Sequence, residues 1–423
     1  MLLAYKYRIY PTEEDKMLLA KHFGCCRFLY NHFLTYRKNE YEQGNKVSYY
    51  ITQKELTKMK ALEKFSWLNE VASQSLQISI QQLDDAYKKF FKQQGGYPNF
   101  KSKHNSIQSC SFPQNIRLEG NKVFLPKFMK NGIRVKIHRN IPKGSSIKQA
   151  TITKKNNKYY ISISFDDNLP TPKPIIAQSS IGLDVGINSL VATSKDVKIA
   201  NPRYTNRYAR LLKLASRHLS RKQHSRKKGD TTPKSKRYLK QQRKVARIHE
   251  KIANSRSDYI HKITNEITNQ YDVICIENLN VKGMIKNRKL SKHIADVAWG
   301  ELRRQLEYKS KRKGKILTKV DRWLPSSQTC SSCLSLTGKK PLNVRTFTCP
   351  VCGTIHDRDN NAAKVIEHYG LLEFYKLGLQ HNLSAGTVDY TRGEPSGGDG
   401  DSISIVAPSS YGSVKRGALT SLK

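Results

Sequence analysis

Four of the eight cysteines in this 423-residue chain are spaced as metal ligands. Cys330 and Cys333 form one Cys-x-x-Cys pair, and Cys349 and Cys352 form a second pair after fifteen intervening residues. Two such pairs place four thiolates at the corners of a tetrahedron around Zn²⁺. Because the protein would fill every coordination position, we expect this zinc to be structural and not catalytic. An iron–sulfur cluster and four unrelated buried cysteines are the alternatives, and the surrounding Ser, Thr and Lys residues favour a zinc ribbon.

Three carboxylates form a second set of candidate ligands. Asp184 lies at the end of an apolar run at 181–185, Glu277 ends the run 273–277, and Asp359 lies where the last predicted helix begins. Two strand ends and a helix start can meet at one edge of a sheet. Three like charges there repel one another unless divalent cations neutralise them. We therefore expect Mg²⁺ or Mn²⁺ at this site.

This set of acids is the kind that two-metal phosphodiester hydrolysis requires. One cation activates the attacking water, and the other stabilises the leaving oxygen. Asp184 is the best bridging ligand, with Glu277 and Asp359 holding one metal each. Taken singly, each acid also has a structural explanation, as a turn residue or a solvated strand end. Asp357 is placed to cap the last helix, which is why Asp359 is preferred as the ligand.

The second half of the chain has an α/β pattern that would position these acids. Apolar strands are predicted at 181–185, 271–276 and 315–320, and 190–193 could pair back on the first of them. A last helix is predicted from 361 to 369. Residues 203–249 are predicted to form a helical pair with seventeen Lys and Arg residues and one acid, Asp230. That imbalance favours contact with nucleic acid over an ordinary solvated face.

The first half predicts strands interrupted by helices. Residues 3–9 alternate as a half-buried strand, Thr12 is placed to cap a helix, and a stronger helix is predicted at 73–93. Residues 115–165 then predict only strands, with a hairpin turn at Asn156-Asn157. We interpret the order as a small β-barrel that carries a helical insertion. From about 383 the chain is rich in Gly, Ser, Asp and Thr, and we expect disorder there.

The net charge indicates the kind of partner. Lys and Arg number 76 against 33 Asp and Glu, a formal charge of +43. Such an excess is usually offset by a polyanion, with nucleic acid favoured over an anionic membrane. No apolar run reaches the roughly eighteen residues of a membrane span, and the N-terminus lacks a signal-peptide core. We therefore expect no membrane partner, a cytosolic location and reduced thiols.

The motifs, taken in order, resemble a known family. Gly-Leu-Asp184-Val-Gly, Ile-Glu277-Asn-Leu, the four-cysteine ribbon and Asp-Arg-Asp359-x-Asn-Ala-Ala resemble TnpB. These are the OrfB-type proteins of bacterial insertion sequences, which are related to the ancestors of type V CRISPR nucleases. Supporting matches lie at 5–11, 23–28, 97–103 and 323–330. The resemblance runs from residue 1 to about 370. Asn278 is a departure, since many members have Asp after the catalytic Glu, but that position is not a ligand.

The resemblance implies a multidomain fold of the α+β and α/β classes. Its β-barrel would comprise 1–10 and 105–175, interrupted by a helical recognition insertion at 11–104. A RuvC-like nuclease of the ribonuclease H fold would comprise 178–325 and 356–375, interrupted by the zinc ribbon at 326–355. Residues 383–423 match nothing that we can interpret.

The resemblance also implies a mechanism and partners. A guide RNA from the transposon end would pair with one strand of double-stranded target DNA, beside a short motif that the protein reads. Asp184, Glu277 and Asp359 would bind magnesium and cut both strands. No small-molecule substrate is implied, and the location would be the bacterial cytosol or nucleoid. The basic helices would line the channel for the paired strands. Tyr30, Asn31, Arg37 and Lys38 are only candidates for contacts with the motif.

Three other functions stay open at this point. A DDE-type transposase also uses three acids on a ribonuclease H fold, although the ribbon and the N-terminal barrel pattern argue against it. A nuclease-inactive RNA-guided DNA-binding protein is disfavoured because all three acids are present. The simplest alternative is a zinc-ribbon nucleic-acid-binding protein whose acids are structural.

Overall fold

The computed structural model describes residues 1–377 except 104–106, 171, 174–175, 223–234 and 342. The chain divides into two compact units. The first comprises Met1–Lys173 and Arg203–Tyr259, and the second comprises Pro174–Pro202 and Ile260–Lys423. Within the described ranges, no helix is both long and apolar enough to cross a bilayer. The predicted disorder beyond 383 concerns residues outside the described ranges.

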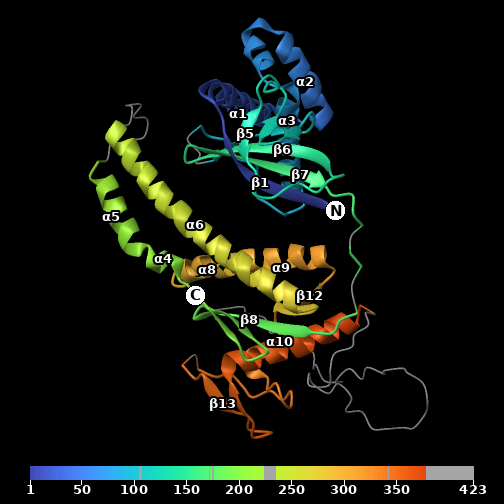
Figure 1. The fold of residues 1–423 in the computed structure, drawn as a ribbon, viewed down its shortest axis with the longest axis vertical. Helices are drawn as coiled ribbons and strands as arrows, with labels where there is room; N and C mark the ends of the chain where they lie inside the picture. Colours follow the sequence, from blue (N-terminus) through green and yellow to red (C-terminus); the bar gives the residue numbers. More distant parts are fainter. Residues whose placement is uncertain (104–106, 171, 174–175, 223–234, 342, 378–423) are drawn as a thin grey trace, which may run out of the picture. The chain divides into compact units, whose positions relative to one another are not determined.

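The first unit is built on a seven-stranded antiparallel sheet (Figure 1). In spatial order the strands are β2 (Ile107–Phe112), β6 (Ser146–Lys155), β7 (Lys158–Asp166), β1 (Leu2–Tyr10), β5 (Ile133–Lys136), β4 (Lys122–Phe124) and β3 (Arg117–Glu119). Asn156 and Asn157 join β6 to β7 with φ angles of 51° and 60°. Asn tolerates this left-handed conformation, which two-residue hairpin turns require, so the predicted hairpin is confirmed.

The predicted barrel is not closed. The sheet ends at β2 on one side and β3 on the other, and these two strands do not pair in the described part of the chain. One physical reason is strand length. β3 and β4 have three residues each, whereas β6 has ten and β7 nine. The strands therefore become shorter toward the β3 edge of the sheet, which leaves few backbone groups for pairing there. The strands at 2–10 and 117–166 therefore follow the prediction, whereas β2 was not predicted and the predicted closure is wrong.

Helices pack on this sheet and share its core. They are α1 (Glu13–Glu42), α2 (Tyr49–Ala61), a 3₁₀ helix (Glu63–Glu70) and α3 (Ser73–Phe91). As predicted, Thr12 caps α1, and Asp15 completes a capping box with it. Buried side chains of α1 and α3, including Phe33 and Leu76, belong to one hydrophobic cluster with strand residues such as Phe165.

The basic segment is helical where it is described. It forms α4 (Tyr204–Arg207), α5 (Ala209–Ser220) and the 35-residue α6 (Lys236–Gln270). The predicted helical pair is confirmed outside 223–234. Glu250 of α6 accepts hydrogen bonds from Asn156 at 3.3 Å, Lys158 at 3.2 Å and Tyr160 at 3.3 Å. The β6–β7 hairpin therefore holds this part of α6 within the first unit.

The second unit contains a five-stranded mixed sheet. Its order is β10 (Lys198–Ala200), β9 (Ser189–Thr193), β8 (Ser180–Val185), β11 (Val273–Glu277) and β12 (Ile316–Val320). The strands β8, β11 and β12 run parallel, and β9 pairs antiparallel with β8. The predicted strands at 181–185, 190–193, 271–276 and 315–320 are confirmed with shifts of one or two residues. The parallel core places the carboxyl ends of three strands at one edge of the sheet.

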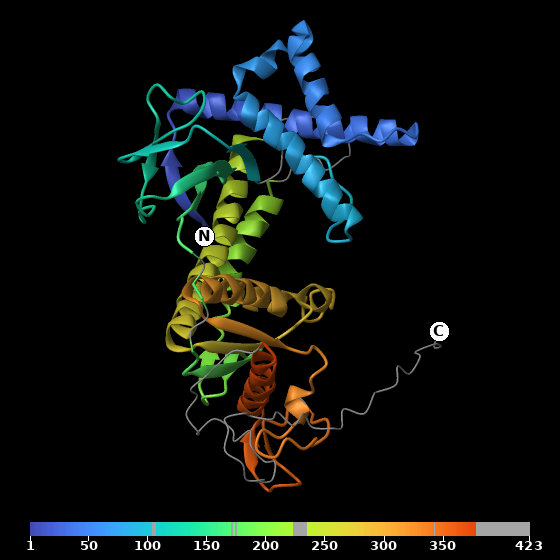
Figure 2. The same ribbon diagram turned by 90° about the vertical axis from the view of Figure 1, so that its right-hand side faces the viewer.

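Helices cover both faces of this sheet. α10 (Arg358–Tyr375) packs on one face against β8, β11 and β12, and α9 (Trp299–Lys313) lies on the other face (Figures 1 and 2). The short helices α7 (Val281–Met284) and α8 (Ser291–Val297) precede α9. Between β12 and α10 lie a 3₁₀ helix (Ser326–Gln328) and a two-stranded sheet made of β13 (Thr346–Thr348) and β14 (Ile355–Asp357). Sequence analysis did not predict α7–α9.

Candidate active site and metal centre

Asp184 and Glu277 lie at the same edge of the parallel sheet. β8 and β11 run side by side, and Leu183 is paired in register with Ile276. Asp184 and Glu277 directly follow these two paired residues in their strands. Neighbouring residues in parallel strands lie about 5 Å apart. The strand register therefore brings together two acids that are far apart in the sequence.

Asp359 comes to the site from the first turn of α10. Asp357 is the N-cap of that helix, and its carboxylate accepts hydrogen bonds from the backbone N–H groups of Asp359 and Asn360, both at 3.1 Å. The cap leaves the Asp359 carboxylate available for other partners. It forms ion pairs with Lys198 at 3.7 Å and Arg345 at 3.5 Å. The assignment of Asp357 as the cap, predicted from sequence, is confirmed.

The half-buried Asp184 lies within the electrostatic reach of Glu277 and Asp359. Burial raises the pKa of the Asp184 carboxyl well above its usual range, and the negative charges of Glu277 and Asp359 raise it further. Burial also raises the pKa of Glu277. A hydrogen bond that Ser326 Oγ donates to Glu277 Oε1 at 2.8 Å lowers this pKa and offsets part of the rise. Crowded carboxylates with hard oxygen donors fit a divalent cation, which would relieve this repulsion.

The spacing of the acids is looser than that of the cysteines. In the described part of the chain, the four cysteines are the one group of three or more candidate ligands whose donor atoms all lie within 4.8 Å of one another. Asp184, Glu277 and Asp359 do not form such a group. Their role as shared metal ligands therefore stays a prediction.

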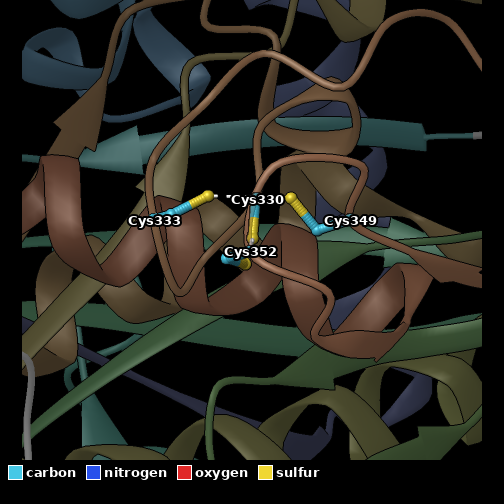
Figure 3. A group of neighbouring side chains, drawn as sticks. All are labelled: Cys330, Cys333, Cys349 and Cys352. Atoms are coloured by element: carbon cyan, nitrogen blue, oxygen red, sulfur yellow. Dashed lines mark hydrogen bonds between the residues drawn. The ribbon is translucent and has the colours of Figure 1, made fainter.

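The cysteine cluster has the dimensions of a tetrahedral zinc site. The Cys330 and Cys352 sulfurs lie 3.7 Å apart, and those of Cys333 and Cys349 lie 3.6 Å apart. Zn–S bonds of about 2.3 Å give tetrahedral S···S separations of about 3.8 Å, whereas a disulfide needs about 2.05 Å. Figure 3 shows the four side chains converging from two loops. Hydrogen bonds from Thr354 lower the pKa of the Cys352 thiol to about 6, which favours the thiolate that zinc binds.

Comparison with known proteins identifies the family. Family models match residues 1–46 ("Helix-turn-helix domain"), 160–288 ("Probable transposase") and 299–366 ("Cas12f1-like, TNB domain"). A Streptomyces pristinaespiralis protein named "Putative RNA-guided DNA endonuclease" is 36% identical over 87% of this chain and 89% of its own length. The Escherichia coli protein "Putative RNA-guided DNA endonuclease InsQ" is 32% identical over 86% of this chain and 91% of its own. The chain belongs to the TnpB family.

Solved structures agree with this TnpB assignment at the level of the fold. The protein chain in "Cryo-EM structure of the Cas12f1-sgRNA-target DNA complex" superposes with a TM-score of 0.54 at 16% identity, covering 84% of this chain and 83% of that one. One family description does not fit the local structure. Residues 1–46 form the strand β1 and the single 30-residue helix α1. The name helix-turn-helix therefore does not describe this part of the TnpB-type chain.

The structure adds residues that sequence analysis did not assign. Ser326 contacts Glu277, and Lys198 contacts Asp359. Asn361 donates a hydrogen bond to the Thr329 carbonyl at 2.7 Å and accepts one from the Ser331 N–H at 2.8 Å, which ties the ribbon to α10. Ser326 and Asn361 both lie within motifs that carried the TnpB resemblance, so their motif membership was a usable signal. Nothing in the sequence around Lys198 marked it.

Proposed function

We propose that this TnpB-type chain is an RNA-guided endonuclease that cuts double-stranded DNA, with Asp184, Glu277 and Asp359 as its catalytic residues. One observation carries the proposal: two adjacent parallel strands and a helix start carry these acids, and burial, followed by the charges of Glu277 and Asp359, raises the pKa of Asp184. The relatives named as RNA-guided DNA endonucleases cover nearly the same length, which supports the same activity here. A guide RNA from the transposon end and a short target-adjacent motif are part of the proposal, as is action in the bacterial cytosol or nucleoid.

The chain's own residues would prepare the site for cations. Two divalent ions would supply water activation and stabilisation of the leaving oxygen. Asp184, Glu277 and Asp359 would hold these ions through their carboxylate oxygens. Ser326 fixes the Glu277 carboxylate through its hydrogen bond. Lys198 and Arg345 orient Asp359 through ion pairs.

Basic surfaces support a nucleic-acid partner. In the first unit, Lys6, Arg8, Lys136 and Lys155 line a hollow beside Tyr160. The Lys6 ammonium and the Arg8 guanidinium both lie over the Tyr160 ring, 4.9 and 5.0 Å from its centroid. Burial lowers the pKa of Lys6, and the charge of Lys155 lowers it further. Cations that repel one another in this way favour a bound polyanion such as an RNA backbone.

The test of the proposal is cleavage by the purified chain. The chain would be purified with RNA transcribed from its own locus, then given matched double-stranded DNA and Mg²⁺. We expect Asp184→Asn to slow cutting by roughly a thousandfold, equivalent to about 4 kcal/mol of transition-state stabilisation. Glu373→Gln is the control, since Glu373 lies on α10 but pairs only with Lys376 among the described residues. Equal cutting by wild type and Asp184→Asn would overturn the site.

A DDE-type transposase is the second candidate, since one family model bears the name "Probable transposase". Supplying transposon ends in the same reaction separates the two functions. Joined products that contain a transposon end would show strand transfer. Linear products with free ends would show hydrolysis. Specific DNA binding without any product would instead indicate a nuclease-inactive protein.

A further inference from the structure

Trp323 is an exposed tryptophan on a loop that contacts Glu277 through Ser326. Its exposed fraction is 83%, the largest among the exposed large hydrophobic residues described. The chain has two other tryptophans. Trp299 is buried at 5% exposure, and the half-buried Trp67 packs edge-on against Phe28 with ring centroids 5.0 Å apart. No described residue stacks on the Trp323 indole. A tryptophan left this exposed offers a large aromatic face to a ligand.

The loop that carries Trp323 is held in place by hydrogen bonds. The backbone N–H of Trp323 donates to the Asp321 carboxylate at 2.7 Å. The Ser326 N–H donates to the Leu324 carbonyl at 2.9 Å. Arg322 Nε donates to the carbonyl of Asn278, the residue after Glu277, at 3.2 Å. An indole on such a fixed backbone loses little conformational entropy when it meets a ligand.

The same loop also contacts the proposed catalytic edge. It follows β12, whose last residue, Val320, is paired in register with Glu277. Six residues after Val320, Ser326 donates its hydroxyl hydrogen bond to Glu277. Trp323 lies midway between these two contacts. The loop therefore connects the exposed ring to a carboxylate of the acidic site through one short, hydrogen-bonded segment.

The surroundings of the ring favour a nucleobase as its ligand. Arg322, the neighbouring residue, is exposed and cationic. An aromatic ring next to a cation is the arrangement that single-strand-binding proteins use, because bases stack on the ring while the cation meets the backbone. A purely apolar protein partner would instead leave this charge poorly solvated.

We propose that Trp323 stacks on an unpaired base of the DNA strand that enters the acidic site and so sets which phosphodiester reaches Asp184. This inference rests on the proposed function and extends it. Trp323 acts here as a positioning residue, since it would touch a base and not the reacting phosphate. Stacking on one aromatic ring contributes about tenfold to the affinity of a single strand.

Tryptophan fluorescence tests the contact without cleavage. The full chain carrying Asp184→Asn would be titrated with single-stranded oligothymidylate and with an abasic strand of equal length and charge. We expect the oligothymidylate to quench the emission and the abasic strand to leave it unchanged. Adding Trp323→Phe should remove most of the quenching, whereas Trp67→Phe, the matched control, should keep it. Equal quenching by both strands, or quenching that survives Trp323→Phe, would overturn the inference.

Kinetics test the consequence for the reaction. With the wild-type RNA complex as reference, Trp323→Ala and Trp323→Leu should raise KM for a target with an unpaired entering strand about tenfold, and should change kcat far less. Trp323→Phe should restore most of the affinity, since it keeps a planar ring while Leu keeps only apolar volume. An RNA strand of the same sequence tells whether the base or the sugar is recognised. If wild type cuts and Trp323→Ala cuts with an unchanged KM, the inference fails while the proposed function stands. If wild type does not cut, the fluorescence result still decides the contact.

Discussion

The carboxyl group of Asp184 lies where its charge is disfavoured. Burial and the neighbouring charges of Glu277 and Asp359 all raise its pKa. A side chain placed only for stability would not be held beside two like charges at the end of two strands. A bound divalent cation reverses the balance, because it favours the ionised form of every carboxylate around it. The arrangement makes sense for a site that is completed by metal.

A stability measurement follows from this at the scale of the residue. The folded-state pKa of Asp184 is raised, chiefly by burial, well above the ordinary value of an aspartic acid, so the folded state binds this proton more tightly than the unfolded state does. Ionisation therefore costs stability as the pH rises from the unfolded pKa through the folded one. Without divalent cations, Asp184→Asn should melt above wild type at neutral pH, and the difference should shrink in acid.

Magnesium should raise the melting temperature of wild type more than that of Asp184→Asn. Bound Mg²⁺ stabilises only the folded state, and a concentration one hundred times its Kd contributes about 2.7 kcal/mol. For a protein of several hundred residues, this amounts to a rise of at least a few degrees in Tm. We expect calorimetry to show that rise for wild type and for the control Glu373→Gln, and little rise for Asp184→Asn. An equal Mg²⁺ effect in all three proteins would contradict Asp184 as a metal ligand.

Among the elements, α10, whose first turn carries Asp359, lies very close to the sheet. Gly370 makes this approach possible. A Cβ at this position would lie 2.4 Å from Cys275 Cβ and 2.5 Å from Cys275 Sγ on β11. Gly182 of β8 is similarly tight, with an added Cβ 2.0 Å from the Ala363 carbonyl oxygen of α10. The helix and the sheet therefore meet at two glycines.

Gly370→Ala should destabilise the second unit. Overpacking of this kind typically costs about 1–3 kcal/mol. The natural control is Gly300→Ala in α9, because a Cβ there would meet nothing within 4 Å. Alanine in that helix should be neutral or stabilising by up to about 1 kcal/mol. Chemical denaturation of both variants gives the comparison, and a Gly370→Ala variant as stable as Gly300→Ala would show that α10 does not pack as described.

The elements also show what sequence could and could not predict. Strand β8, the Thr12 cap and the Asn156-Asn157 turn were predictable because their signals are local: apolar runs, capping residues and residues that accept positive φ. Barrel closure was not predictable, since it depends on how far short strands such as β3 extend. Ser326 and Lys198 reach the acids only through tertiary contacts. The first sheet is not the closed barrel that was predicted, and the bounds of the helical insertion at 11–104 and of the nuclease within 178–375 stay predictions.

For the whole molecule, the charge of +43 should govern how it binds nucleic acid. Part of that charge is already neutralised within the protein. Lys16, Lys58 and Lys88 each pair with an acid on the same helix, at distances of 2.6, 2.7 and 2.9 Å. In contrast, Lys240, Arg243 and Arg247 of α6 are exposed, line one groove, and pair with no acid in the described part of the chain. The two sets carry the same charge but differ in how much of it is free for a polyanion.

This contrast gives a prediction about salt. Each phosphate that the protein neutralises adds about 0.7 to the slope of log K against log salt for a single strand, and about 0.9 for a duplex. Changing Lys240, Arg243 and Arg247 together to Gln should therefore lower the slope by about 2 to 3 and weaken RNA binding most at low salt. The same change at Lys16, Lys58 and Lys88 removes an equal formal charge but should leave the slope nearly unaltered. Equal slopes for the two triple variants, measured by filter binding over a range of KCl concentrations, would mean that net charge alone attracts the nucleic acid and that α6 has no special part in holding it.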